Sequence, residues 1–217
     1  MSVHMQREMN VINQSLLSLA GMVEQQVSRA VRALNSRDAD LATLVRSADA
    51  TIDQREIEVE EECLKALALY QPVAGELRQV VATLKITNDL ERIGDLAVNI
   101  AKKAVYCALS TPIENQPDLS SMTELALRQL RESLEALVQM DVSLAEKVRA
   151  RDTELNQMKK ELRQTLETRM QQHPGLIPML LTLLGAVRNL ERIGDHATNI
   201  AEDVIYLVGG HIVRHSF

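Results

Sequence analysis

Apolar residues recur along almost the whole chain with the spacing of long amphipathic helices. The clearest case lies between residues 86 and 104, where apolar side chains alternate in steps of four and three. At about 100° per residue these positions fall on one narrow stripe, the pattern of a helix that faces a bundle core. The stripe is formed by Ile86, Leu90, Ile93, Ala97, Ile100 and Ala104. We expect it to be the core seam of a three-helix bundle.

Helix-start and helix-stop signals divide the chain into six helices. Asp38 is a good N-cap residue, Pro72 forces a turn, and Gly209-Gly210 ends the last helix. The segment 110–118 contains two prolines and is the one convincing linker. Helices this long favour an extended antiparallel bundle. The expected helices cover about residues 5–34, 38–70, 73–109, 119–139, 141–171 and 174–207.

The third and sixth of these helices each carry a second apolar face. It lies opposite the core stripe and directly before a run of acidic residues. A helix that is apolar on two sides is buried on two sides. We therefore expect these two helices to pack against each other. The residues expected at the contact are Leu77, Val81 and Leu84 on one helix and Ile177, Leu181 and Leu184 on the other.

The chain contains an internal duplication. The pentapeptide ERIGD stands at residues 91–95 and again at 191–195, and 12 of the 23 positions from 84 to 106 are identical to those 100 residues further on. A weaker match pairs residues 38–53 with 141–156. The two blocks keep their order, which indicates a repeated unit of about 100 residues. We expect a first three-helix domain over residues 1–110 and a second over 119–217.

The composition supports an all-α protein that stays in solution. Aromatic residues make up only 2% of the chain, and its 8 glycines and 5 prolines are too few for a sandwich or barrel of short strands. The net charge of −6 argues against general nucleic-acid binding. Cys63 and Cys107 fit no metal or redox spacing and are expected to be buried thiols. With no signal peptide at the start, and with its most apolar stretch (179–187) about half a membrane span, the chain is expected to be cytoplasmic and not inserted in a membrane.

Paired carboxylates stand on the polar side of both duplicated helices. Glu91 and Asp95 are four residues apart, as are Glu191 and Asp195, so each pair lies side by side on its helix. Such pairs can chelate a hard cation. The alternative is a solvated acidic face whose charge is neutralised by the neighbouring arginines, Arg92 and Arg192.

The second helix of each repeat offers further candidate ligands, but unequally. In the first repeat Asp49, Asp53, Glu56 and Glu60 share one helical face. In the second repeat Asp152 is the one carboxylate kept, and the next three positions are Asn156, Lys159 and Arg163. Because binding of a hard cation strengthens with the number of carboxylates, we expect any divalent cation to bind more tightly to the first bundle.

Gly94 and Gly194 stand in the middle of their helices, where each costs about 1 kcal/mol relative to alanine. This cost predicts a close approach by a neighbouring element. His196 has Leu96 at the matching position and is interpreted as a surface substituent. The chain has no phosphate-binding loop, no nucleophile elbow and no E-x-x-H motif of di-iron carboxylate enzymes. We therefore expect a binding protein without an active site.

The duplicated stretch LERIGD-x-A-x-N-I-A, together with GMVEQQ at residues 21–26, resembles the PhoU family of phosphate-signalling regulators. The resemblance extends from about Ser15 to Gly209. It implies an all-α fold of two side-by-side three-helix bundles, built by tandem duplication from six long antiparallel helices, in a protein that is often a homodimer. It also implies negative regulation of the phosphate-starvation response and of phosphate uptake. In that family the regulator links the ATPase subunit of the phosphate ABC transporter to a sensor histidine kinase.

Some members of the family carry metal clusters on E/D-x-x-x-D motifs. The resemblance therefore implies divalent or iron-type metal ions at Glu91, Asp95, Glu191 and Asp195, with Asp49, Asp53 and Asp152 as further candidate ligands. The leading interpretation is a non-enzymatic adaptor between transporter and kinase. The alternative is a metal-binding storage or redox protein that uses the same carboxylates.

Overall fold

The computed structural model describes residues 3–210, and every regular element in that range is a helix. The expected end of the second domain, residues 211–217, lies outside this range. The long helices are α1 (Val3–Ser36), α2 (Ala39–Tyr70), α3 (Gly75–Leu109), α4 (Ser120–Gln139), α5 (Val142–Gln172) and α6 (Ile177–Gly209), with a short 3₁₀ turn, η1 (Pro174–Leu176), before α6. The predicted tandem all-α fold is confirmed. The non-helical residues between Leu109 and Ser120 join the two halves.

Local signals explain most helix boundaries. The Asp38 side chain accepts a hydrogen bond of 2.8 Å from the Leu41 amide, which caps α2 as expected. Gly210 adopts a left-handed conformation (φ 71°) just past the end of α6. The start of α3 lies two residues later than predicted. Pro72 is followed by Ala74 at φ 50°, and the helix begins only at Gly75.

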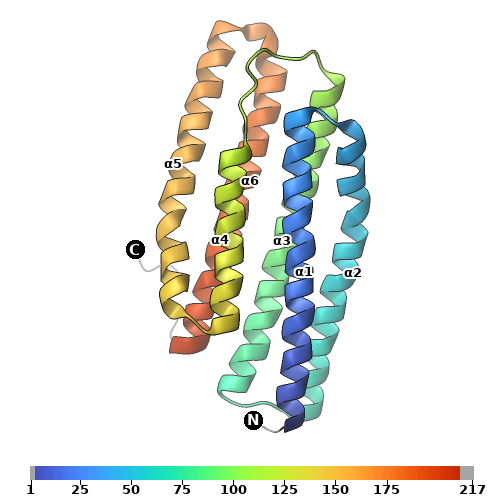
Figure 1. Ribbon diagram of the computed structural model, residues 1–217, viewed down its shortest axis with the longest axis vertical. Coiled ribbons are helices and arrows are strands. Elements are labelled where there is room, and N and C mark those ends of the chain that lie inside the picture. Colours follow the sequence, from blue (N-terminus) through green and yellow to red (C-terminus); the bar gives the residue numbers. More distant parts are fainter. Residues whose placement is uncertain (1–2, 211–217) are drawn as a thin grey trace.

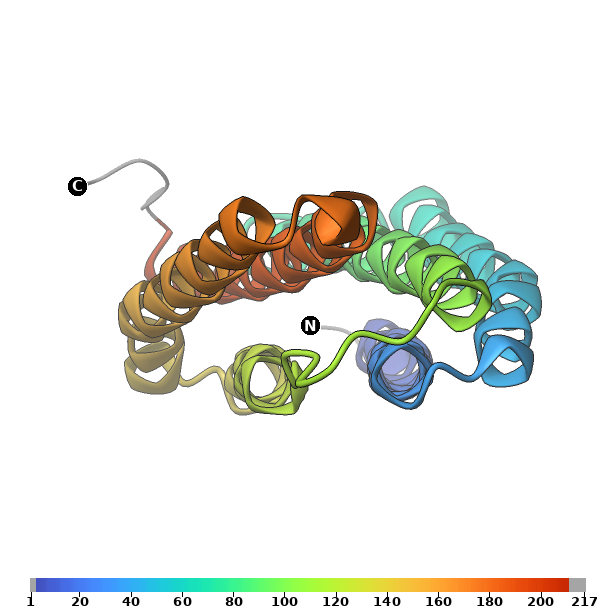
Figure 2. The ribbon, with the colours of Figure 1, turned by 90° about the horizontal axis from the view of Figure 1, so that it is seen from above.

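The two three-helix bundles lie side by side (Figure 1). Helices α3 and α6 run antiparallel along the middle of the molecule, and their contact is as extensive as those inside each bundle. Seen from above, α2, α3, α6 and α5 form one curved layer, and α1 and α4 lie together against its inner side (Figure 2). The predicted packing of the third helix on the sixth is therefore confirmed.

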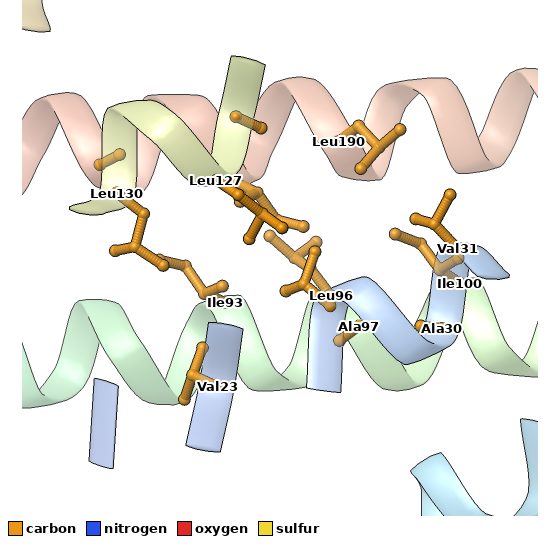
Figure 3. Packing of buried hydrophobic residues seen from close by; sticks show 14 of the residues in the cluster. Val23, Ala30, Val31, Ile93, Leu96, Ala97, Ile100, Leu127, Leu130 and Leu190 are labelled. Carbon is orange, nitrogen blue, oxygen red and sulfur yellow. The ribbon is translucent and has the colours of Figure 1, made fainter. Parts of the chain in front are cut away.

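The core runs continuously through both bundles. All six residues of the predicted core stripe on α3 are completely buried. Side chains of the first bundle such as Val23 and Ile93 belong to the same apolar cluster as Leu127 and Leu130 of the second (Figure 3). Cys63 and Cys107 are free and buried, as expected, and burial raises the pKa of the Cys63 thiol to about 12.

Three of the six residues predicted to form the α3–α6 contact are exposed. Leu77, Ile177 and Leu181 are 41%, 37% and 53% exposed. The reason is the antiparallel register, which brings Lys85 to Asp203. In that register α6 ends at Gly209 before it can cover Leu77.

The same register separates the two leucines at the end of each predicted set. Leu84 and Leu184 lie at opposite ends of the helix pair, because Lys85 of α3 contacts Asp203 near the end of α6. Leu84 packs instead on a small apolar cluster of the first bundle that includes Met9 and Val59. The sequence pattern therefore predicted correctly that α3 and α6 pack together, but it did not predict the register of that contact.

No helix in the described range 3–210 is sufficiently long and apolar to traverse a bilayer.

Candidate functional site

The acidic stripe of α2 faces the acidic residues of α3, which the metal hypothesis required. Burial raises the pKa of Glu56, and the neighbouring Glu91 carboxylate raises it further. The pKa of Asp49 is likewise raised by burial, although a hydrogen bond from Gln26 opposes the shift, and Asp95 is among the carboxylates that repel it. The two helices therefore bring their carboxylates within electrostatic reach of one another.

Arg92 partly neutralises this first cluster. Its Nε atom lies 3.2 Å from Glu91 Oε2, and its Nη1 atom lies 3.2 Å from Asp95 Oδ2. The arginine side chain is half exposed, so water screens both pairs. Burial still raises the pKa of Glu91, and repulsion from Asp95 raises it further. The cluster of Asp49, Asp53, Glu56, Glu60, Glu91 and Asp95 thus keeps a large excess of negative charge.

The matching cluster of the second bundle contains its own cation. Lys159 of α5 forms an ion pair with Glu191 of α6, at the position where the first bundle has Glu56. Asn156 Nδ2 donates a 2.8 Å hydrogen bond to Asp152 Oδ2. Partial burial, with repulsion from Glu191 and Asp152, raises the pKa of Asp195 to about 6. The second cluster is therefore smaller and already partly neutralised.

The donor chemistry of the first cluster fits a hard cation, because carboxylate oxygens are the ligands that such ions prefer. Among residues 3–210, however, no three His, Cys, Asp or Glu side chains stand in an arrangement that could hold a metal ion. The carboxylates would have to turn toward a common point to bind one directly. The structure thus brings the predicted residues of each bundle together without forming a finished chelate.

Both mid-helix glycines lie under a close contact, as predicted. A Cβ atom on Gly94 would lie 3.3 Å from Gln26 Oε1. On Gly194 it would overlap the Leu155 side chain and lie 2.9 Å from Gln129 Oε1. In each bundle a buried glutamine therefore occupies the space that the glycine leaves open.

The sequence interpretation gave these two glutamines no role. Gln26 is 4% exposed, and its Nε2 atom donates to the Val45 carbonyl at 3.3 Å and to Asp49 Oδ1 at 3.2 Å. It thereby orients one carboxylate of the first cluster. Gln129 stands 103 residues further on and is completely buried. The repetition of a polar residue on an otherwise apolar helix face was the signal that could have identified the pair.

His196 is not the surface substituent that the sequence suggested. Its side chain is 17% exposed, and its Nδ1 atom lies 2.8 Å from Oδ1 of Asp89, which is buried in α3. Asn199 Nδ2 also donates to Asp89 Oδ1, at 3.4 Å. The comparison with Leu96 was misleading because Leu96 is part of the apolar core, whereas His196 contacts Asp89 across the α3–α6 contact. His196 joins the two bundles and does not extend the acidic cluster.

Comparison with known families agrees with this duplicated architecture. The PhoU domain matches the chain twice, over residues 16–104 and 119–204, and each match contains one ERIGD motif. The chain belongs to the PhoU family. Between them the two PhoU domains cover most of the chain, and each corresponds to one three-helix bundle.

Individual relatives resemble the whole chain. The PhoU homolog of Pseudomonas putida, named a phosphate-specific transport system accessory protein, is 39% identical over 96% of this chain and 82% of its own length. Its Escherichia coli (strain K12) counterpart is 34% identical over 96% and 86%. The crystal structure of PhoU from Pseudomonas aeruginosa covers 95% of this chain and 99% of its own, with a TM-score of 0.90 and 37% identity. That of the phosphate transport system regulatory protein PhoU from Streptococcus pneumoniae covers 96% and 99%, with a TM-score of 0.84 and 30% identity.

Proposed function

We propose that this PhoU protein restrains the phosphate-starvation response and phosphate uptake by linking a phosphate ABC transporter to its sensor histidine kinase. The observation that carries the proposal is the pair of PhoU domains in a chain that matches transport accessory proteins over 96% of its length. The partners are the ATPase subunit of the transporter and the kinase. The proposed site of action is the cytoplasm, and the proposed assembly is a homodimer.

The adaptor works without catalysis, by protein contacts. The long helices lie side by side and give broad surfaces on which partners can dock. The α3–α6 contact fixes the two bundles relative to each other. A rigid pair of bundles can hold two partners at a set distance, which is what an adaptor between transporter and kinase requires.

The acidic cluster of the first bundle supplies a divalent metal site within the same function. The support is that the pKa values of Asp49, Glu56 and Glu91 are all raised, by burial and by repulsion between carboxylates. A bound cation would relieve that repulsion. Asp49, Asp53, Glu91 and Asp95 are the candidate ligands. The bound cation would hold α2 against α3. A storage or redox protein could use the same residues, and it would need neither transporter nor kinase.

Deletion of the gene tests the regulatory role. Transcription from a phosphate-starvation promoter should become constitutive in high phosphate, and the intact gene supplied in trans should restore repression. A reporter that is still repressed in high phosphate after deletion would contradict the adaptor role. Capture of the tagged chain with the transporter ATPase and the kinase separates the two alternatives, because only the adaptor retains both partners.

A further inference from the structure

An open pocket lies between α2 and α3. Its lining residues stand near the start of α2 and the end of α3, and these two helix ends lie at the same end of the first bundle (Figure 1). Its volume is about 450 Å³. Two cations and two hydroxyl groups line it, with one apolar side chain between them. The lining residues are Thr43, Arg46 and Ser47 of α2 and Val98 and Lys102 of α3.

The two cations of this pocket have no carboxylate partner in the part of the chain that the structure describes. Within residues 3–210 neither Arg46 nor Lys102 forms an ion pair with another side chain. Lys102 feels the negative charge of Asp49, but as the weakest of the influences on that carboxylate. Two positive charges therefore face the same open space.

The duplication provides an internal comparison for this pocket. The residue that matches Arg46 is Arg149, and its Nη1 atom lies 2.9 Å from Glu146 Oε2. Its Nε atom lies 3.5 Å from Glu202 Oε1. Those two glutamates stand where the first bundle has Thr43 and Lys102. In the second bundle the arginine thus holds two carboxylates that the protein itself supplies.

We infer that the pocket of Thr43, Arg46, Ser47 and Lys102 binds a small oxyanion of the phosphate type. Arg149 shows that an arginine at this position reaches carboxylate oxygens on both helices. In the first bundle the same space is open and lined by cations and hydroxyls, so the anion must come from solution. A guanidinium suits the planar edge of an oxyanion, since it can donate two parallel hydrogen bonds.

Charge and hydrogen-bonding capacity favour a dianion with several oxygens. Two cations suit a phosphate, which carries about one to two negative charges near neutral pH. The Thr43 and Ser47 hydroxyls now donate to helix carbonyls, Thr43 to Ala39 at 2.9 Å and Ser47 to Leu44 at 3.0 Å. Each can rotate to donate to an anion instead. Because the pocket is open to water, binding should weaken as ionic strength rises.

Titration calorimetry with inorganic phosphate on the purified chain tests the site, with chloride used to keep ionic strength constant. The parent protein should bind one phosphate per chain, and Arg46→Gln should weaken binding by about tenfold or more. Sulfate should compete with phosphate, because it has the same shape and charge. Absence of saturable phosphate binding in the parent, or equal affinity in Arg46→Gln, would overturn the inference.

Exchange of residues between the copies gives matched controls. Thr43→Glu with Lys102→Glu gives Arg46 the two carboxylates found around Arg149, and phosphate binding should be lost. Glu146→Thr with Glu202→Lys should create a second phosphate site. Thermal unfolding checks that each variant is folded. If a double variant does not fold, the phosphate affinity of Arg46→Gln is the deciding measurement.

Binding of an acidic peptide in place of phosphate would overturn the inference in favour of a protein partner. Because binding is measured on the purified chain, a negative result leaves the regulatory role, which is tested in cells, unaffected.

Discussion

Lys159 of α5 is ion-paired with Glu191 of α6. At the matching position of the first bundle Glu56 faces Glu91, and the Glu91 carboxylate adds to the effect of burial in raising the pKa of Glu56. A single difference between the copies thus turns a repulsive contact into an attractive one. The two bundles share a backbone but differ in the charge at the centre of the α2–α3 and α5–α6 faces.

This difference predicts unequal metal binding. Removal of one carboxylate by Asp95→Asn should weaken binding of Mg²⁺, Mn²⁺ or Ni²⁺ by about tenfold or more, or about 1.4 kcal/mol. Asp195→Asn should have a much smaller effect, because Lys159 already neutralises part of its cluster. Titration calorimetry on metal-free protein measures both. Equal losses in the two variants would contradict the asymmetry, and no binding in the parent would favour a solvated acidic face.

The raised pKa of Asp195 predicts how stability depends on pH. Its pKa is about 6 in the folded chain, against 3.8 for an aspartate that is free of such surroundings. Between these two pH values the Asp195 carboxyl is protonated more often in the folded state than in the unfolded state. The stability of the parent therefore falls as pH rises from about 4 to 6. Asp195→Asn removes this penalty. The variant should unfold at a higher temperature than the parent at pH 7, and the difference should vanish near pH 4.

Thermal unfolding in the presence of a chelator makes this comparison free of bound metal. Asp95→Asn is the matched control, because it removes a carboxylate that pairs with Arg92 at 3.2 Å. The change also relieves repulsion of Glu91, so any gain in stability at pH 7 should be smaller than that of Asp195→Asn. A variant Asp195→Asn that is no more stable than the parent at pH 7 would show that the charge on Asp195 carries no cost in the fold.

Much of this architecture could be predicted from the sequence. Helix periodicity is a local signal, and the duplication is visible when the chain is compared with itself. The stripe that contains Leu90 and Ile93 identified a buried face, and Asp38 identified a helix start. Neither signal specifies how two helices that are distant in sequence are aligned along each other. Leu84 and Leu184 were therefore expected in one contact between the two helices, although antiparallel packing places them at opposite ends of the helix pair.

The candidate site was predictable to a similar extent. Carboxylates one turn apart on a helix must lie side by side, so Glu91 and Asp95 form a pair in any fold that keeps the helix. That the stripe containing Asp49 turns toward them depends on how α2 rotates in the bundle, which the sequence left open. The partnership of Asp89 with His196 depends on the contact between bundles, and comparison with Leu96 concealed it.

The Asp89–His196 contact predicts a cost for its removal. His196→Leu copies the residue of the first repeat and leaves the buried Asp89 with the longer bond from Asn199. A buried acceptor that loses its main partner costs about 1–3 kcal/mol. Urea unfolding should show a loss of that size. His173→Leu, which alters an exposed histidine at the end of α5, is the control and should change stability little. Equal stability of the His196 variant and the parent would contradict a stabilising role for the contact.

The two mid-helix glycines predict unequal responses to the same substitution. In Gly194→Ala the new methyl group would overlap Leu155, which is completely buried and cannot move aside without repacking. Overpacking costs about 1–3 kcal/mol, and the gain of about 1 kcal/mol in helix propensity offsets only part of it. We expect Gly194→Ala to destabilise the protein by up to about 2 kcal/mol, which lowers the melting temperature by about 2–4 °C per kcal/mol at this size.

Gly94→Ala meets milder contacts, 3.3 Å to Gln26 Oε1 and 3.5 Å to the Ile52 side chain. A shift of a few tenths of an ångström relieves them, so the gain in helix propensity should leave this variant within about 0.5 kcal/mol of the parent. Thermal unfolding of both variants under one set of conditions gives the comparison. If Gly94→Ala proved the more damaging of the two, the tighter contact would not lie in the second bundle. The function of Gly94 would then be to leave room for the hydrogen bond from Gln26 to Asp49, which the alanine would displace.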